Sequence, residues 1–237
     1  MHYKSKKLVA FTLLELSIVL AIIGVLLVPA MNFFITSQKS AKVINTRKHL
    51  EVVSNALFLY YRSHNRLPCP ADITLDISNS SSGTENCSLN YDIDGTGNND
   101  ILYGAVPVDD IGVSFKYFTD GWGYKVSYYV RKDTTNSPGT MIGSTDIYTH
   151  NKNIGRDDGG TAFVLISHGE DARGSYPKTG GNDPNSTSGA TADELKNIYD
   201  VGTSKDITTS SRLIISNGAI SDISISATGG DLINEIL

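Results

Sequence analysis

The sequence predicts an α+β fold in which a long N-terminal helix packs against an antiparallel β-sheet. An apolar run near the N-terminus passes into an amphipathic helical pattern, and residues 67–237 alternate short β-like runs with polar loops. Over all 237 residues, 40% are apolar and 19% are charged, which is typical of a folded protein. The net charge of −5 argues against a nucleic-acid partner.

The apolar run covers residues 8–35, of which 22 of 28 are apolar, and its only charge is Glu15. A helix of this length can cross the hydrocarbon core of a bilayer, about 30 Å thick, although the mean hydropathy of the whole chain is only −0.13. A secretory signal usually has a shorter apolar region, roughly 7–15 residues. Glu15 is either an acid near the helix end that reaches toward water, or a functional group that needs a partner charge.

Beyond residue 35 the pattern is that of an amphipathic helix. Leu50, Val53, Leu57 and Tyr60 share one face at a period of 3.6 residues. Pro68 disfavours helix at the residue before it, so we expect one helical segment over residues 11–66. Gly24 and Pro29 predict a kink or local melting in its first half. Basic residues lie on both sides of the apolar run and do not decide its orientation: Lys4, Lys6, Lys7, Lys39, Lys42, Arg47 and Lys48.

The region 67–237 contains five candidate strands, at 101–108, 113–118, 124–131, 162–167 and 212–216. The sequence Asp-Gly-Trp-Gly at 120–123 predicts a hairpin turn between the second and third of these strands. Long stretches rich in Gly, Ser, Thr, Asn and Asp predict solvated loops between the other strands. One α+β domain is therefore expected.

One loop has the spacing of a cation site. Oxygen-bearing side chains alternate along residues 92–100, and Gly97 stands where a calcium loop needs a sharp turn. The five candidate calcium ligands are Asp92, Asp94, Thr96, Asn98 and Asp100. An EF-hand would have Glu at the twelfth position, where Tyr103 stands, so an acidic turn without a metal is the alternative.

Motifs of enzymes do not occur in the chain. There is no G-x-S-x-G elbow, H-E-x-x-H zinc motif, phosphate-binding loop or dinucleotide fingerprint. Ser167 and His168 are neighbours in the sequence, which does not make them a catalytic pair. We therefore expect no catalytic residues and no cofactor other than the calcium considered above.

The N-terminus resembles the processing signal of type IV pilins and of type II secretion pseudopilins. Residues 6–10, Lys-Lys-Leu-Val-Ala, are followed at 11–16 by Phe-Thr-Leu-Leu-Glu-Leu and then by the apolar run. The family pattern is a short basic leader, a small residue, Phe-Thr-Leu-hydrophobic-Glu and about 20 apolar residues. Ala10 stands where the family most often has Gly. The resemblance implies that a prepilin peptidase removes the leader, residues 1–10, by cleaving between Ala10 and Phe11, and that the new Phe11 amine is then methylated.

The resemblance also implies an architecture and partners. Residues 11–35 would cross the bacterial inner membrane and later form the filament core, with the N-terminus cytoplasmic and the domain 67–237 periplasmic, in a lollipop shape. Glu15 would pair with the Phe11 amine of a neighbouring subunit in a homo- or hetero-polymer. An inner-membrane assembly platform and a separate cytoplasmic ATPase would drive assembly. Loss of the leader removes three lysines and changes the formal charge to −8.

Short motifs in the C-terminal region are similar to those of the major pseudopilin of type II secretion. These include Asp-Gly-Trp-Gly-Tyr at 120–124 and a later strand that ends in Ser-His-Gly at 167–169. If the family orientation holds, Cys69 and Cys87 lie in an oxidising compartment that favours a disulfide. Two free thiols, or half of a metal site, are the alternatives.

The function expected from this resemblance is that of a structural subunit of a type IV pilus or a type II secretion pseudopilus. A minor pilin whose loops bind a surface or a substrate is the second hypothesis. A membrane-anchored periplasmic enzyme is the third, and the absence of catalytic motifs disfavours it. Competence machinery is a further setting for the same kind of subunit.

Overall fold

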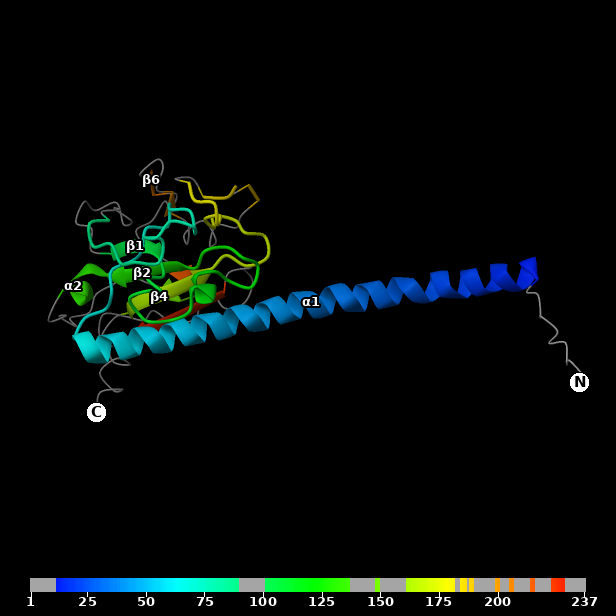
Figure 1. Cartoon of the computed structure of the whole chain (residues 1–237), viewed down its shortest axis with the longest axis horizontal. Helices are drawn as coiled ribbons and strands as arrows, with labels where there is room; N and C mark the ends of the chain where they lie inside the picture. The colour runs from blue at the N-terminus through cyan, green and yellow to red at the C-terminus, as the bar shows by residue number, and fades with distance from the viewer. Residues whose placement is uncertain are drawn as a thin grey trace, which may run out of the picture. The chain divides into compact units, whose positions relative to one another are not determined.

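The computed structural model describes residues 12–89, 101–136, 148–149, 161–181, 184–186, 188–189, 199–200, 205–206, 214–215 and 223–228 (Figure 1). The chain divides into two compact units, Met1–Lys42 and Val43–Leu237. In the second unit an antiparallel sheet packs with the end of the long helix, so the α+β class is confirmed.

Helix α1 runs from Leu13 to His64 and is the longest element of the chain. It continues through Gly24 and Pro29, so of the two predicted alternatives, a kink or local melting, the local melting is wrong. A proline lacks the N–H group for one backbone hydrogen bond of the helix. The hydrogen bonds of the neighbouring turns are sufficient to keep the helix continuous at that position. At the other end, Asn65 adopts a left-handed conformation (φ 52°) and its N–H donates to the carbonyl of Tyr61 (2.8 Å). The helix therefore ends at His64, four positions before Pro68.

The second half of α1 supplies part of the hydrophobic core. Leu50, Val53 and Leu57 are fully buried and Tyr60 is nearly so, which confirms the predicted apolar face. The ring of Phe58 meets that of Phe163 from the sheet edge-on, with 6.0 Å between their centres. This half of the helix is therefore an integral part of the globular unit.

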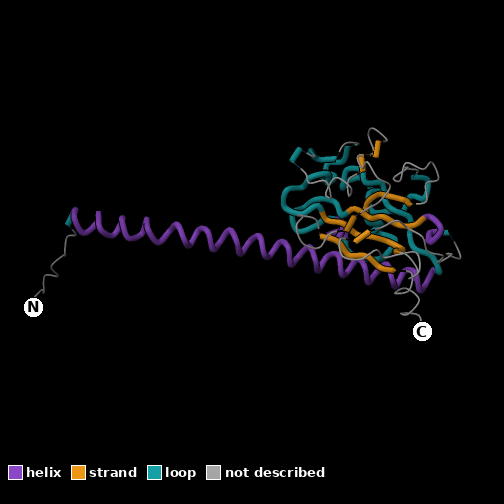
Figure 2. The backbone as a smooth tube through the Cα atoms, turned by 180° about the vertical axis from the view of Figure 1, so that it is seen from behind, coloured by secondary structure: helices purple, strands orange, loops and turns teal. Residues whose placement is uncertain are grey.

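The main sheet has the order β1-β2-β4-β8, and all its pairs are antiparallel. Its strands are β1 (Ile101–Ala105), β2 (Ser127–Arg131), β4 (Thr161–Ser167) and β8 (Ile223–Thr228). Tyr129 stands between Tyr103 and Val164 in the register, and all three are buried. Figure 2 shows these strands gathered beside the last turns of α1.

Smaller elements complete the fold. They are the 3₁₀ helix η1 (Phe115–Phe118), the short helix α2 (Lys132–Thr135), the parallel pair β3 (Tyr148–Thr149) and β7 (Ile214–Ile215), and the antiparallel pair β5 (Tyr199–Asp200) and β6 (Lys205–Asp206).

Four of the five candidate strands overlap an observed strand, and the candidate at 113–118 is wrong. Residues Phe115–Phe118 form η1, in which Phe115 and Phe118 stack with ring centres 4.8 Å apart. Side chains three residues apart lie above one another in a 3₁₀ helix, and this pair has that spacing. Strand β8 is missing from the prediction, although Ile223 and Ile225 alternate with serines as in a strand with one apolar face.

Candidate functional site

The first turn of α1 is capped by Thr12. Its hydroxyl oxygen accepts a hydrogen bond from the backbone N–H of Glu15 (3.2 Å). Thr-x-x-Glu is the sequence of a capping box, in which the threonine satisfies an N–H group that has no partner inside the helix. The carboxylate of Glu15 is therefore placed in the first turn, at the positive end of the helix dipole. The sequence prediction did not use this role of Thr12, which the spacing of the two residues could have indicated.

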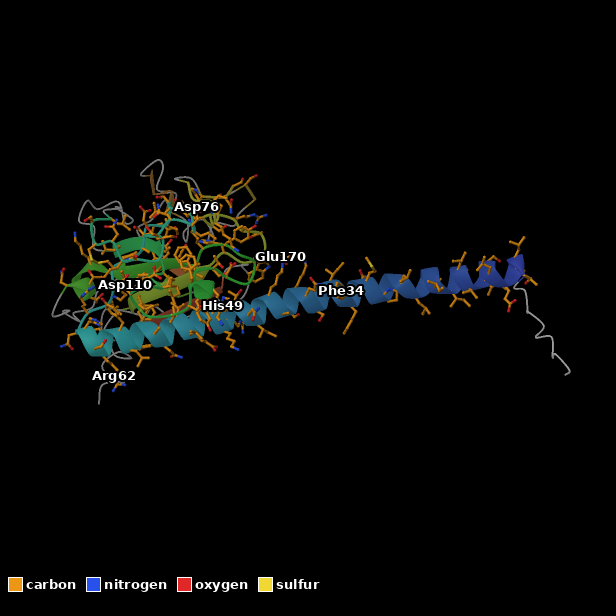
Figure 3. The ribbon with its side chains drawn as sticks, viewed as in Figure 1. Phe34, His49, Arg62, Asp76, Asp110 and Glu170 are labelled. Carbon is orange, nitrogen blue, oxygen red and sulfur yellow. A yellow bond between two sulfur atoms is a disulfide. The ribbon has the colours of Figure 1, made fainter. Side chains whose placement is uncertain are left out.

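The surface around Glu15 is apolar. The large hydrophobic side chains described between Leu13 and Ile35 are 43–88% exposed, and Phe34 (Figure 3) is among them at 62%. By length and composition this helix could cross a membrane, and a signal sequence would pass the same test. In a soluble core helix the apolar window would be mostly buried, whereas here none of it is buried by the chain itself.

The predicted processing site lies outside the described residues. Both Ala10 and Phe11, and with them the predicted partner amine for Glu15, fall in the stretch before residue 12. Of the predicted processing and assembly residues, the structure thus places only Glu15.

The two cysteines form a disulfide, as predicted, with 5.1 Å between the Cα atoms of Cys69 and Cys87. Cys69 is fully buried just after the end of α1, and Cys87 is exposed in the loop that follows. The bond therefore ties the polar loop 70–86 to the end of the helix.

Glu85 holds the same loop through polar contacts. Its carboxylate accepts two hydrogen bonds from the guanidinium of Arg66 (2.7 and 2.9 Å) and one from the backbone N–H of Cys69 (2.9 Å). The hydroxyl of Tyr60 also donates to it (3.3 Å). The hydrogen bonds from Arg66 keep the pKa of Glu85 below its ordinary value. Sequence reasoning missed this ion pair because no motif links residues 66 and 85.

One group of residues with metal-binding chemistry occurs in the described part of the chain. The sulfurs of Cys69 and Cys87 and a carboxylate oxygen of Glu85 lie within 4.8 Å of one another. Both sulfurs are used by the disulfide, and Glu85 by Arg66, so this group does not provide a metal site in the oxidised protein.

The predicted calcium ligands Asp92, Asp94, Thr96, Asn98 and Asp100 lie outside the described residues, in the gap between 89 and 101. Tyr103, at the position where an EF-hand has its bidentate glutamate, is a core residue of β1 and is 1% exposed.

The Asp-Gly-Trp-Gly segment forms a tight turn organised by Asp120. One oxygen of its carboxylate accepts the backbone N–H groups of Trp122, Gly123 and Tyr124 (2.7–2.9 Å), and the other accepts the hydroxyl of Ser167 (2.7 Å). Burial raises the pKa of Asp120, and these hydrogen bonds oppose the shift. An isolated antiparallel bridge between Thr119 and Lys125 closes the predicted hairpin turn. The ladder stops at this bridge, because residues 115–118 form η1 and not a strand.

A serine–histidine contact also occurs that the sequence did not suggest. The hydroxyl of Ser127 lies 3.2 Å from Nε2 of His168, and both residues are within 1% of complete burial. A nucleophile must reach its substrate, so this buried pair is a structural contact between β2 and the end of β4.

Comparisons with known proteins do not assign the chain to a family. No protein-family model, curated protein or solved structure matches it.

Proposed function

We propose that this chain is a pilin-like structural subunit that a prepilin peptidase processes and that assembles into a type IV pilus or a type II secretion pseudopilus. The observation that carries the proposal is Glu15, the only charge in residues 8–35, on a helix whose described apolar side chains are exposed. The family resemblance of residues 6–16 supports the same function.

The energetics of Glu15 favour a partner outside the chain. A carboxylate inside a bilayer costs about 3 kcal/mol on insertion scales, and removal of an isolated charge from water costs more. An amine of a second copy would neutralise the acid, so docking is favoured where the two charges meet. This pairing would also set the axial register between neighbouring subunits.

The apolar part of the helix fits both stages of the proposal, insertion into the membrane and assembly into a filament. Residues 11–35 span about 37 Å at 1.5 Å per residue, enough for the hydrocarbon core of a bilayer. After extraction from the membrane, the same apolar surface needs other apolar surfaces to cover it. Helices of further copies would provide them, and the globular unit would remain on the outside in the lollipop arrangement of pilins.

The first test is the substitution Glu15→Val in the organism that carries the gene. We expect the variant to insert into the membrane at the wild-type level and to be absent from sheared filaments. The matched control is Ser17→Val, which changes an uncharged polar residue two positions further along the same helix. Among the contacts described, the Ser17 hydroxyl bonds only the carbonyl of Leu14. Normal incorporation of the Glu15→Val chain into filaments would contradict the proposal.

The second test is mass spectrometry of the purified chain. We expect a mature N-terminus at Phe11 that carries a methyl group, and we expect the full-length chain when the peptidase gene is deleted. The amount of the chain in filaments, relative to the other subunits, then distinguishes a major subunit from a minor one. A chain that retains residues 1–10, or that loses the whole apolar segment, would contradict the processing step.

A further inference from the structure

The disulfide is asymmetric toward solvent. Cys69 is fully buried, whereas Cys87 is exposed. We therefore expect an external thiol to attack the sulfur of Cys87, with Cys69 as the leaving group. The Glu85 carboxylate lies within 4.8 Å of both sulfurs and is held there by the N–H of Cys69.

Reduction by a thiol proceeds in two exchanges. A thiolate attacks Cys87 Sγ and forms a mixed disulfide, while the Cys69–Cys87 bond breaks and its electron pair leaves on Cys69 Sγ, which then takes a proton from water. A second thiolate attacks the external sulfur of the mixed disulfide and releases Cys87 as a thiolate. The protein gains two electrons and two molecules of the external thiol are oxidised to a disulfide.

Negative charge near the sulfurs opposes the first exchange. The departing thiolate of Cys69 forms in a buried position beside a carboxylate, and the attacking thiolate approaches the same carboxylate. A leaving thiol that is poorly stabilised as a thiolate leaves slowly. Arg66 keeps Glu85 in place and offsets part of its charge. We propose that Glu85 is an electrostatic shield that protects the Cys69–Cys87 disulfide from reduction by thiols.

The test measures the rate of reduction of the full chain in detergent by dithiothreitol at fixed pH, followed by alkylation of the released thiols. We expect Glu85→Gln to be reduced about tenfold faster than the wild type, because the neutral amide removes the repulsion. Near-UV circular dichroism before the reductant is added shows whether each variant is folded.

The control is Arg66→Gln, which breaks the same ion pair and leaves the carboxylate without its compensating cation. The shield predicts slower reduction, by about threefold, whereas mere loosening of the loop predicts faster reduction in both variants. Equal rates in all three proteins, or acceleration by both substitutions, would overturn the proposal.

A comparison that requires no variant uses thiols of opposite charge on the wild-type chain. Cysteamine carries an ammonium group and 3-mercaptopropionate carries a carboxylate. After normalisation to a small model disulfide, we expect cysteamine to react several-fold faster with the protein. Equal normalised rates would refute the shield even if neither variant folds.

Discussion

Ala172 has a backbone conformation that an alanine rarely adopts. Its φ is 57°, and its carbonyl accepts both the N–H and the hydroxyl of Ser175 (3.1 and 2.7 Å). Left-handed geometry costs a residue with a Cβ about 1–2 kcal/mol. The turn that follows β4 therefore contains local strain, which the hydrogen bonds around Ser175 hold in place.

We predict that Ala172→Gly stabilises the fold by about 0.5 kcal/mol, because relief of this strain exceeds the added entropy of the unfolded chain. Chemical denaturation of the purified protein measures the change. The contrasting variant is Ala56→Gly within α1, where glycine should destabilise by about 1 kcal/mol. Destabilisation by both substitutions would contradict the assignment of strain to Ala172.

Lys125, like Ala172, is in an unfavourable environment, in this case because its charged group is buried. It is fully buried, and its ammonium donates to the carbonyls of Ile73 (2.8 Å) and Leu75 (2.5 Å). Burial lowers its pKa to about 8, against the attraction of Asp76 and Asp72. Lys125 thus ties residues 73–75 to the segment that leads into β2, although its charge is removed from water.

At the scale of elements, the contact between α1 and the Asp120 turn depends on two polar groups of the helix. Thr46 accepts the N–H of Gly121 (2.9 Å), and Nδ1 of His49 (Figure 3) lies 2.9 Å from the carbonyl of Thr119. Thr46 is fully buried and Gly121 is half-buried, so the hydroxyl satisfies a backbone N–H group on the inner side of the turn.

We predict that Thr46→Val lowers the free energy of unfolding by about 1–3 kcal/mol, because the N–H of Gly121 loses its acceptor without a change in side-chain volume. Thermal unfolding checks the effect. The variant Thr46→Ser keeps the hydroxyl and should lose less than half as much. A valine variant as stable as the wild type would show that water or another group replaces the threonine.

At the scale of the whole molecule, Lys125 makes stability depend on pH. Its pKa of about 8 in the folded chain is below the ordinary value of 10.5, so between these values the unfolded chain binds the proton more strongly. Stability should therefore rise with pH through this window, by up to about 3 kcal/mol.

Denaturation at pH 7.5, 8.5 and 9.5 tests this dependence. The range lies below the titration of the buried Tyr128, whose raised pKa makes the stability fall with pH at more alkaline values. In Lys125→Met the rise should be absent. A wild-type stability that is flat or falling over this range would show that the ammonium is better stabilised than its burial suggests.

Local patterns predicted the parts of the molecule that depend on local chemistry. The period of Leu50, Val53 and Leu57 is a property of the helix itself, and it predicted the face that the core buries. Alternating runs predicted β1, β2 and β4 for the same reason. The length of the apolar segment and the isolated charge of Glu15 are likewise visible without coordinates, as was the pair of cysteines that form the disulfide.

Only the tertiary structure decided which distant groups meet. Glu85 pairs with Arg66 beside the disulfide, and Lys125 meets carbonyls some 50 positions earlier in the chain, because the sheet and the helix end bring these segments together. Residues 115–118 have a composition that favours a strand, but they form η1, in which the rings of Phe115 and Phe118 stack. Sequence by itself thus determined the long helix, the strands β1, β2 and β4 and the isolated acid of the apolar segment, since these are set by neighbours along the chain. The polar contacts that hold the globular unit together depend on distances through space, which no local pattern encodes.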